Sequence, residues 1–512
     1  MGPSAWEGLV RAEQAWQTCK SGSPPARTVV FESSTSLETP DWDVVICGGT
    51  LGILLGTALV ERGWRVAVVE RGQLRGRDQE WNTSRQELVC LVELGLLSPT
   101  ELEAVIASEY PATQVRFSGS GQYRIPDVLN IGVDPVSLLA RLLERFRTEG
   151  GVLLEQTDFL QSTIHPQGVA VTVRGEGGER YLRARLLIDG MGQFSPIVRQ
   201  LRRGGRPDGV CLVVGSCATG YRDDREADLM ATITGVTGDC QYFWEAFPAR
   251  DGRTTYLFTY VDADPRRGSL TGLFEDYLRL LPDYQGTPLE ELHFQRALYS
   301  FFPAYRNSPL RSDLARLLLI GDASAQQSPL SFGGFGSMLR HLPRLVSGVD
   351  RALEANRLDV AALQSLQPYQ PNIAVTWLFQ RAMCPTVGQN LPPEQINRLL
   401  GVVFEEMAKL GPEVLKPFLQ DAVRWDGLTR TMLAAFGRDP LLIAGVVRQV
   451  GLPALVEWLG HYLNLGLYAA VQPPLAAAWN TWGKMLEERS PELAFEVWAR
   501  LQAVSYGSGQ ES

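Results

Sequence analysis

The sequence has few of the residues that mark several classes of protein. It contains only 4 histidines among 512 residues, and none of them stands at a metal-site spacing from a cysteine. Its 7 cysteines are odd in number and include no CxxC pair, which is typical of reduced thiols in the cytoplasm. The net charge of −9 provides no basic surface for nucleic acid. We therefore expect no disulfides, no metal and no nucleic-acid partner.

Uninterrupted apolar runs are also missing. The first residues lack the basic start and apolar core of a secretory signal and carry two early glutamates. Residues 458–483 contain no Asp, Glu, Lys or Arg, but they include His461, three side-chain amides and the pair Pro473-Pro474. A spanning helix needs about 20 mostly apolar residues. We therefore expect a break at the proline pair, no membrane span and a cytoplasmic protein.

The strongest chemical motif is a strand, a glycine turn and a helix in residues 43–70. Gly49 and Gly52 stand where the helix begins, so backbone N–H groups can approach a pyrophosphate and the helix can lie close to the sheet. The second strand ends in Glu70, where a carboxylate can bind ribose hydroxyls. The usual first glycine is replaced by Cys47, so the tight turn must accept a Cβ with the help of Gly48. Alone, this unit is equally compatible with a βαβ unit that binds nothing.

Two later segments also join a buried strand to a glycine turn. Residues 185–200 and 315–342 each end a strand at a Gly/Asp pair, and the second continues into a glycine-rich turn and a helix. An acidic side chain there can bind ribityl hydroxyls, and the helix N-terminus can face phosphate or an anionic flavin ring. Three such segments in this order predict an FAD site. The predicted cofactor residues are Gly48, Gly49, Gly52, Glu70, Asp189, Gly190, Gly321, Asp322, Gly333, Gly334 and Gly336.

The order of these patterns predicts the architecture. We expect an α/β fold in which a Rossmann-type FAD-binding domain carries an inserted antiparallel β-sheet substrate domain and is followed by a helical C-terminal region. The predicted parts are an N-terminal extension (1–42) with a short amphipathic helix, the FAD-binding domain (43–205), the β-sheet domain (206–310), the closing FAD segment (311–345) and the helical region (346–505).

Four segments together resemble a known family. They are ICGGTLG, WNTSRQEL, IDGMGQFSPIVRQ and GDASAQQSPLSFGGFGSMLRHLPRL. They look like the CruA/CruP-type lycopene cyclases of photosynthetic bacteria and plastids, closer to the CruP branch, within the FAD-dependent superfamily of hydroxylases, prenyl reductases and carotenoid cyclases. The resemblance runs from about residue 43 to about residue 475 and implies a carotenoid or other polyprenyl lipid substrate, reduced FAD as the active form, and NAD(P)H as reductant.

Lycopene cyclisation needs an acid, because a terminal double bond is protonated before the ring closes and a ring proton is lost. The paired glutamates of plant-type cyclases are missing here: Thr259 and Tyr260 stand where the resemblance places them. The nearest carboxylate in an apolar setting is Glu245, between Trp244 and Phe247, where burial would raise its pKa. The alternative is an ordinary strand glutamate that faces solvent. The surrounding aromatic residues are either the lining of a polyene tunnel or simple core: Tyr242, Phe243, Trp244, Phe247 and Tyr256.

Three functions remain open from the sequence. The first is a lycopene cyclase-like enzyme, the second is a flavin-dependent reductase or monooxygenase that acts on a prenyl lipid, and the third is a flavin- and carotenoid-binding protein without turnover. Residues 440–471 are apolar, with Leu441 and Leu442 expected on one helical side and Trp458 and Leu459 on another. These sides either dock on a bilayer, the inner or the thylakoid membrane, or pack together as a helical core.

Overall fold

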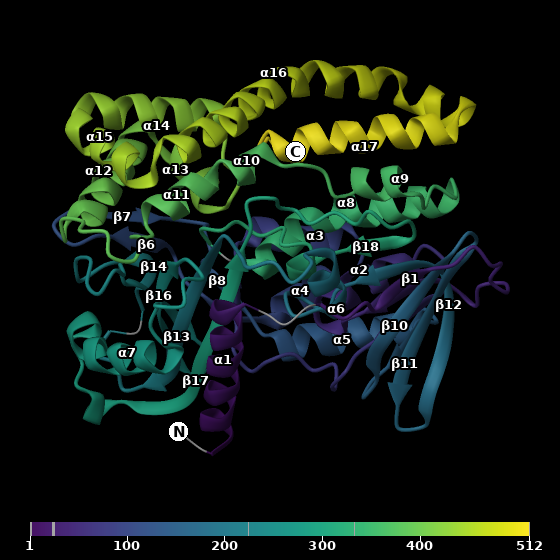
Figure 1. Ribbon diagram of the computed structural model, residues 1–512, viewed down its shortest axis with the longest axis horizontal. Helices are drawn as coiled ribbons and strands as arrows, with labels where there is room; N and C mark the ends of the chain where they lie inside the picture. Colours follow the sequence, from purple (N-terminus) through teal and green to yellow (C-terminus); the bar gives the residue numbers. More distant parts are fainter. Residues whose placement is uncertain (1–2, 23–25, 224, 332, 511–512) are drawn as a thin grey trace.

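The computed structural model describes residues 3–22, 26–223, 225–331 and 333–510. Two β-sheets lie side by side, and helices of the C-terminal part form a layer over both of them (Figure 1). This arrangement confirms the predicted α/β fold class with a helical C-terminal region.

The first sheet is the Rossmann-type part of the fold. Its parallel strands run in the order β9-β3-β2-β12-β18, and β12 continues into an antiparallel hairpin with β11 and β10. The central strands β2 and β3 are buried on both faces, which explains their uninterrupted apolar sequences. The eight strands are β1 (Val30–Glu32), β2 (Trp42–Cys47), β3 (Val66–Val69), β9 (Val152–Leu154), β10 (Asp158–His165), β11 (Gly168–Gly175), β12 (Gly178–Asp189) and β18 (Leu317–Leu319).

The second sheet has seven strands in the order β17-β13-β16-β15-β14-β6-β7. Its antiparallel centre is formed by strands that lie within residues 206–310, where the sequence predicted a β-sheet domain. Two strands differ from the expectation, because residues 113–125 lie within the stretch assigned to the first domain but pair with this sheet. The strands are β6 (Thr113–Arg116), β7 (Gln122–Ile125), β13 (Gly209–Thr219), β14 (Ala227–Ala231), β15 (Phe243–Ala249), β16 (Gly252–Val261) and β17 (His293–Ala304).

A third, small sheet is built from segments that lie in the sequence between strands of the two larger sheets. It has the order β4-β8-β5, and the segment that carries it also contains two capped helices. Its strands are β4 (Trp81–Thr83), β5 (Ile106–Glu109) and β8 (Ile131–Val133), and the helices are α3 (Arg85–Glu93) and α4 (Pro99–Val105). The division of the chain into five parts stays a prediction.

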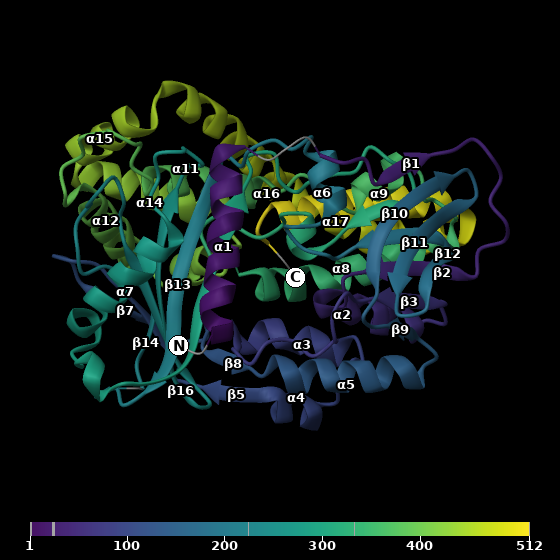
Figure 2. The same cartoon turned by 60° about the horizontal axis from the view of Figure 1, so that its bottom comes forward.

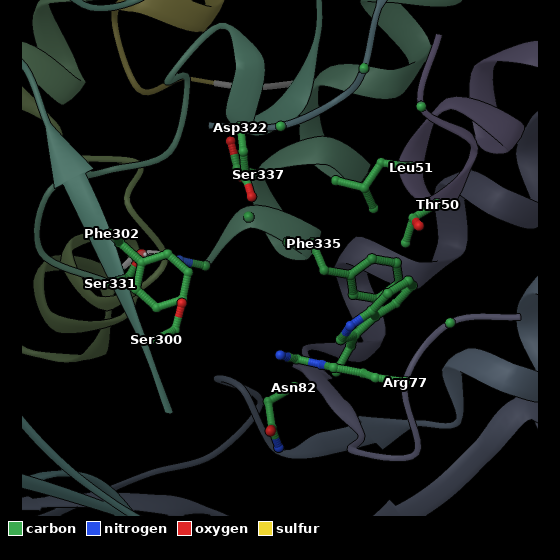
Figure 3. A pocket seen from close by; sticks show the side chains of 18 of the residues that line it. Thr50, Leu51, Arg77, Asn82, Ser300, Phe302, Asp322, Ser331, Phe335 and Ser337 are labelled. Atoms are coloured by element: carbon green, nitrogen blue, oxygen red, sulfur yellow. Dashed lines mark hydrogen bonds between the residues drawn. The ribbon is translucent and has the colours of Figure 1, made fainter. Parts of the chain in front are cut away.

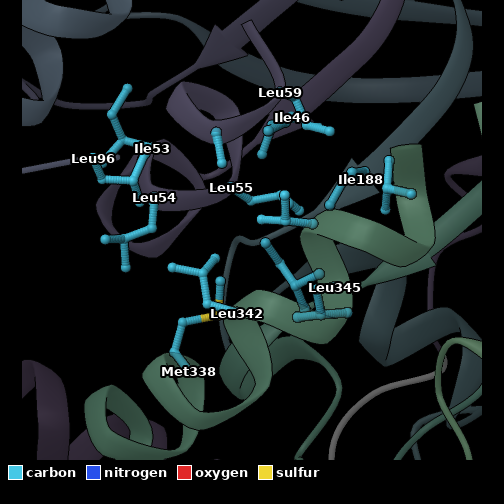
Figure 4. Close-up of a cluster of buried hydrophobic side chains, with 14 of the residues drawn as sticks. Ile46, Ile53, Leu54, Leu55, Leu59, Leu96, Ile188, Met338, Leu342 and Leu345 are labelled. Carbon is cyan, nitrogen blue, oxygen red and sulfur yellow. The ribbon is translucent and has the colours of Figure 1, made fainter. Parts of the chain in front are cut away.

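Three helices cover one face of the first sheet: α2 (Gly49–Val60), α5 (Pro135–Thr148) and α8 (Gly334–Glu354). The leucines of α2 meet Met338, Leu342 and Leu345 of α8 in the main core (Figure 4). Ile46 from β2 and Ile188 from β12 close this cluster from the sheet side (Figure 4). The pieces of chain that hold the predicted cofactor residues are therefore joined by one hydrophobic core.

The N-terminal helix α1 (Pro3–Ser21) is longer than predicted and is not a separate appendage. It packs on β17 and on α7 (Leu270–Gln285), across the edge of the second sheet (Figure 2). Trp16 is fully buried there, and its indole N–H donates a 3.0 Å hydrogen bond to the carbonyl oxygen of Gly268. The centroid of its ring lies 5.8 Å from that of Phe301.

The remaining helices form the layer above the sheets. They are α9 (Val360–Ser365), α10 (Pro371–Ala374), α11 (Thr376–Ala382), α12 (Gln395–Leu410), α13 (Pro412–Leu419), α14 (Trp425–Arg438), α15 (Pro440–Val450), α16 (Leu452–Arg489) and α17 (Pro491–Gly507). Helix α6 (Pro196–Leu201) is the exception, because it packs with Val45, Cys47 and Val69 on the other face of the first sheet. Short 3₁₀ turns lie at Leu289–Glu291 and Gly321–Ala323. The predicted break at Pro473-Pro474 is wrong, since α16 continues through both prolines. Both are exposed, so water can bind the carbonyl groups that lose an N–H partner.

Among the described helices, none is both long enough and apolar enough to cross a bilayer alone. The pair α15 and α16 reaches the required composition only when taken together, and the two helices meet at an angle of 105°.

Candidate cofactor and substrate site

One large cavity lies where the first sheet, the second sheet and the C-terminal helices meet. Its volume is about 1150 Å³, above the roughly 300–1000 Å³ that is usual for small-molecule pockets. Figure 3 shows side chains of α2, of the loop after β3, of β17 and of the turn after β18 at this cavity, among them Thr50, Arg77, Phe302 and Asp322. Eight of the predicted site residues border the cavity: Gly48, Glu70, Gly190, Glu245, Asp322, Gly333, Gly334 and Gly336.

The turn between β2 and α2 depends on Gly48. Its φ of 99° is a left-handed conformation, and a Cβ at this position would collide with the carbonyl oxygen of Gly190. Cys47 is the last residue of β2 and its side chain is fully buried. The left-handed residue of the turn is Gly48, so the turn accepts the Cβ of Cys47. A Cβ on Gly52 would lie 2.7 Å from Ile46 Cγ2, so Gly52 allows the helix to pack closely on the strand, away from the cavity.

Glu70 follows β3 and faces the start of α2. Its Oε2 accepts a 2.8 Å hydrogen bond from the N–H of Gly49, and its Oε1 accepts one of 3.1 Å from Gly72. Gly49 itself is buried behind this carboxylate and does not border the cavity. The first motif thus places a fixed carboxylate at a strand end, beside a helix N-terminus.

Asp189 lies behind the cavity wall, whereas its neighbour Gly190 borders the cavity. One carboxylate oxygen of Asp189 accepts a 2.9 Å hydrogen bond from the N–H of Met191, and the other accepts one of 2.6 Å from Ser195 Oγ. Complete burial raises the pKa of Asp189 to about 6. The side chain therefore holds the loop that leads into α6, and it does not present its carboxylate to the cavity.

Asp322 borders the cavity in the 3₁₀ turn that follows β18. Burial raises the pKa of its carboxyl, and the guanidinium of Arg77 acts in the opposite direction. A Cβ on Gly334 would lie 2.6 Å from Asp322 Oδ1, so glycine is needed where this carboxyl touches the start of α8. Gly321 has a φ of 55° and supports the turn from outside the cavity.

Two helices begin at the cavity with a glycine as the N-cap residue, and at α2 the N–H of Gly49 alone is bound by the carboxylate of Glu70. Gly48 precedes α2 and Gly333 precedes α8, and neither offers an oxygen to the first backbone N–H groups. Other helices of this region are capped by side chains, namely those of Ser84, Asp134 and Ser195. The cavity wall therefore carries two positive helix ends whose N–H groups suit an anionic ligand.

Several residues of the cavity wall were not predicted. Arg77 lies in the loop after β3, and Arg340 stands two turns into α8, with its guanidinium 3.7 Å from Glu87 and 3.9 Å from Asp421. Asp421 follows α13, has a φ of 58°, and accepts a hydrogen bond from Ser331 Oγ. The C-terminal helices thereby close the cavity next to the start of α8. Glu87 lies in the segment WNTSRQEL, and Ser331 and Arg340 lie in GDASAQQSPLSFGGFGSMLRHLPRL, both of which the sequence had singled out without naming these side chains, whereas Arg77 and Asp421 lie in neither.

Glu245 stands in the wall that the second sheet provides. Alternation along β15 places Phe243, Glu245 and Phe247 on one face, and Tyr256 of β16 lies directly opposite Glu245. Among the described residues, no group donates a hydrogen bond to this carboxyl and no basic side chain pairs with it. Burial in this apolar wall raises the pKa of Glu245 to about 8. At neutral pH the carboxyl is therefore largely protonated.

The aromatic residues around Glu245 divide between the cavity and the core. Phe247 and Tyr256 border the cavity, as do the unpredicted Phe258 and Phe302. The others are used elsewhere: Phe243 stacks beneath Phe258, Trp244 stacks on Tyr284, and Tyr242 donates a hydrogen bond to Asp276. Thr259 and Tyr260 are both buried, and the hydroxyl of Tyr260 donates to the carbonyl oxygen of Leu330.

Several solved structures of enzymes share the fold of this chain. A geranylgeranyl bacteriochlorophyll reductase-like protein from Thermoplasma acidophilum has a TM-score of 0.53 and 13% identity, and the match covers 82% of this chain and 100% of that one. Halogenase PltM in complex with phloroglucinol and FAD has a TM-score of 0.55 and 13% identity over 91% and 98%. For p-nitrophenol 4-monooxygenase PnpA from Pseudomonas putida the values are 0.54 and 15% over 75% and 99%.

No model of a known family and no curated protein matches the sequence. At these identities the similarity shows the fold alone, which this chain shares with a halogenase solved in complex with FAD.

Proposed function

We propose that the cavity binds FAD. The observation that carries this proposal is the pair of helix N-termini that follow glycine N-caps, those of α2 and α8, at one cavity that also holds Glu70 and Asp322. The turn at Gly48 would hold the pyrophosphate, Glu70 the adenosine ribose and Asp322 the ribityl chain. The N-terminus of α8, at Gly333 and Gly334, would face the flavin ring.

The purified protein is then expected to be yellow, with flavin that denaturation releases. Glu70→Ala and Asp322→Ala should each weaken FAD binding by about 1.5–3 kcal/mol, because each removes hydrogen bonds to a charged acceptor. Fluorescence titration of the apoprotein with FAD measures this loss. Asp359→Ala serves as a control, since this carboxylate caps α9 through the N–H of Ala362 away from the cavity. Affinities unchanged in both cavity variants would contradict the proposal.

We further propose that the substrate is a carotenoid or another polyprenyl lipid, and that the chain acts as a lycopene cyclase of the CruA/CruP type, closer to CruP. The apolar wall of the second sheet suits a polyene and holds one carboxyl, Glu245, that keeps its proton at neutral pH. Glu245 would give this proton to the terminal double bond of an end group. The neighbouring double bond attacks the resulting cation, a new C–C bond closes the ring, and a ring proton returns to the carboxylate.

The remaining residues of the wall would orient and shield the substrate. Phe247, Tyr256 and Phe258 exclude water from the cation and present aromatic faces to it. Bound in its reduced, anionic form, FAD would supply negative charge that stabilises a cation. The reaction is an isomerisation of the substrate without net transfer of electrons. NAD(P)H would therefore serve only to reduce the flavin once.

The proposed reaction can be separated from redox chemistry by its electron balance. Under anaerobic, reducing conditions, lycopene should be converted to a cyclic product without stoichiometric oxidation of NAD(P)H. Pigment chromatography and the absorbance of NADH measure the two quantities together. Conversion coupled to NADH consumption would instead favour a prenyl-lipid reductase or monooxygenase, a class represented among proteins of this fold. Lycopene that is bound but unchanged would favour a binding protein without turnover.

A further inference from the structure

Helix α16 exposes an apolar row that the rest of the protein does not cover. Leu452, Val456, Leu459, Leu463 and Leu467 follow one another at helical spacing and are 47–68% exposed. We call these five residues the α16 stripe. The row extends over about 22 Å of helix at 1.5 Å per residue. An uncovered apolar row of this length on a soluble surface indicates an interaction site.

The surroundings of the α16 stripe carry almost no charge. Residues 458–483 contain no Asp, Glu, Lys or Arg. Glu457 is paired with Arg306, with 3.0 Å between Oε2 and Nη1. A 2.6 Å hydrogen bond joins the Nδ1 atom of His461 and the hydroxyl of Tyr369. Burial lowers the pKa of this histidine, which favours its uncharged form. No exposed, unpaired charge on α16 between Leu452 and Gly483 therefore opposes transfer of this face to an apolar medium.

Each helical side named from the sequence divides between core and surface. Leu442 and Trp458 are buried, and the indole N–H of Trp458 donates a 2.9 Å hydrogen bond to the carbonyl oxygen of Val375. Leu441, Leu459 and Leu463 are exposed, Leu441 by 85%. The helices thus have both a packed side and a free side.

The free side extends beyond α16. The neighbouring helices α14 and α15 lie along the same edge of the molecule (Figure 1), and α14 exposes Leu433 and Phe436. Towards the end of α16, Trp482 is 61% exposed and is followed by the exposed Lys484, while Arg448 is exposed near the end of α15. Tryptophan and basic side chains that bracket an apolar face are typical of helices at the headgroup level of a bilayer.

The residue types of the α16 stripe favour lipid over a protein as its binding partner. Protein interfaces concentrate their binding energy in Trp, Tyr and Arg, whereas Leu and Val are under-represented among such residues. The stripe is made of Leu and Val alone. We propose that the α16 stripe docks on the surface of a lipid bilayer, with α16 lying along the surface and not crossing it. This inference does not depend on the cofactor or the substrate.

Flotation of the full-length protein with phosphatidylcholine vesicles tests the proposal. The wild-type protein is expected to float with the vesicles, and raised salt should leave the bound fraction unchanged because apolar contact carries the binding. The triple variant Leu459→Gln, Leu463→Gln, Leu467→Gln should bind about tenfold or more weakly. Leucine and glutamine have similar helix propensities and the sites are exposed, so circular dichroism and the melting temperature should not change.

A matched control places glutamine at exposed apolar positions elsewhere, Val89→Gln and Phe294→Gln, and should float like the wild type. Each single leucine variant should show part of the loss, which guards against a triple variant that fails to fold. The proposal is overturned if the wild-type protein stays with the soluble fraction or if the triple variant floats equally well. It is also overturned if sedimentation shows a wild-type dimer that the triple variant splits, since the occupant would then be a second copy.

Discussion

Glu245→Gln is expected to slow conversion of the substrate by about two to four orders of magnitude, the usual contribution of a general acid. Glutamine keeps the size and neutrality of the protonated carboxyl but has no proton to give. Initial rates of lycopene conversion, at equal flavin content, measure the effect. Glu179→Gln is the matched control, because Glu179 is exposed and pairs with Arg174 on the first sheet. Full activity in Glu245→Gln would remove this residue from the mechanism.

The pH dependence follows from the pKa of Glu245, which burial raises to about 8. The protonated carboxyl is the donor, so activity should be present below about pH 8 and fall about tenfold per unit above it. Stability gives a second readout, because the folded pKa lies above the unfolded one. Protonated Glu245 therefore contributes to the free energy of unfolding. This contribution is complete below the ordinary glutamate pKa and is lost as the pH rises through about 8. The wild-type protein should therefore lose melting temperature relative to Glu245→Gln across this window.

Gly48→Ala is expected to abolish flavin binding and to lower the free energy of unfolding by about 3–5 kcal/mol. The new methyl group would collide with the backbone of Gly190, in a residue already held at a φ of 99°. Either the turn or the loop after β12 must move, and both border the cavity. Chemical denaturation and the flavin absorbance of the purified protein measure the two effects.

Gly63→Ala provides a closely matched control. Gly63 lies just beyond the other end of α2 with a φ of 85°, but nothing lies within 4 Å of an added Cβ. Its cost should be limited to backbone strain of about 1–2 kcal/mol, with flavin retained. Equal losses in the two variants would show that the collision with Gly190 plays no part.

The sequence predicted those parts of the site that depend on local geometry. The glycine turn before α2, the carboxylate of Glu70 and the start of α8 each belong to one short segment whose backbone demands are visible in its residues. The sequence named Glu245 as the carboxylate in an apolar setting but left open whether it faces solvent, which the pairing of β15 with β16 decides. Asp189 was predicted at the cofactor, whereas its carboxylate holds its own loop through Ser195, because a strand-end carboxylate can do either.

Other features depend on contacts between distant segments and leave no local pattern. Strands β6 and β7 are short, and only pairing with β14 assigns them to the second sheet. Arg340 and Asp421 meet because α13 ends over the start of α8, which no periodicity reveals. The sequence left open whether the apolar sides of α15 and α16 are packed or free, because this depends on the 105° angle at which the two helices meet.

The meeting of α2 with α8 in the main core has a consequence for synthesis of the protein. Gly334 emerges from the ribosome long after Val60, on the order of 10–50 seconds later at about 5–20 residues per second. During this time Leu54 and Leu55 lack the partners that bury them in the finished fold, and β12 lacks β18. The first sheet can therefore not be completed until about two thirds of the chain has been synthesised, and the apolar faces that β18 and α8 cover stay exposed until then.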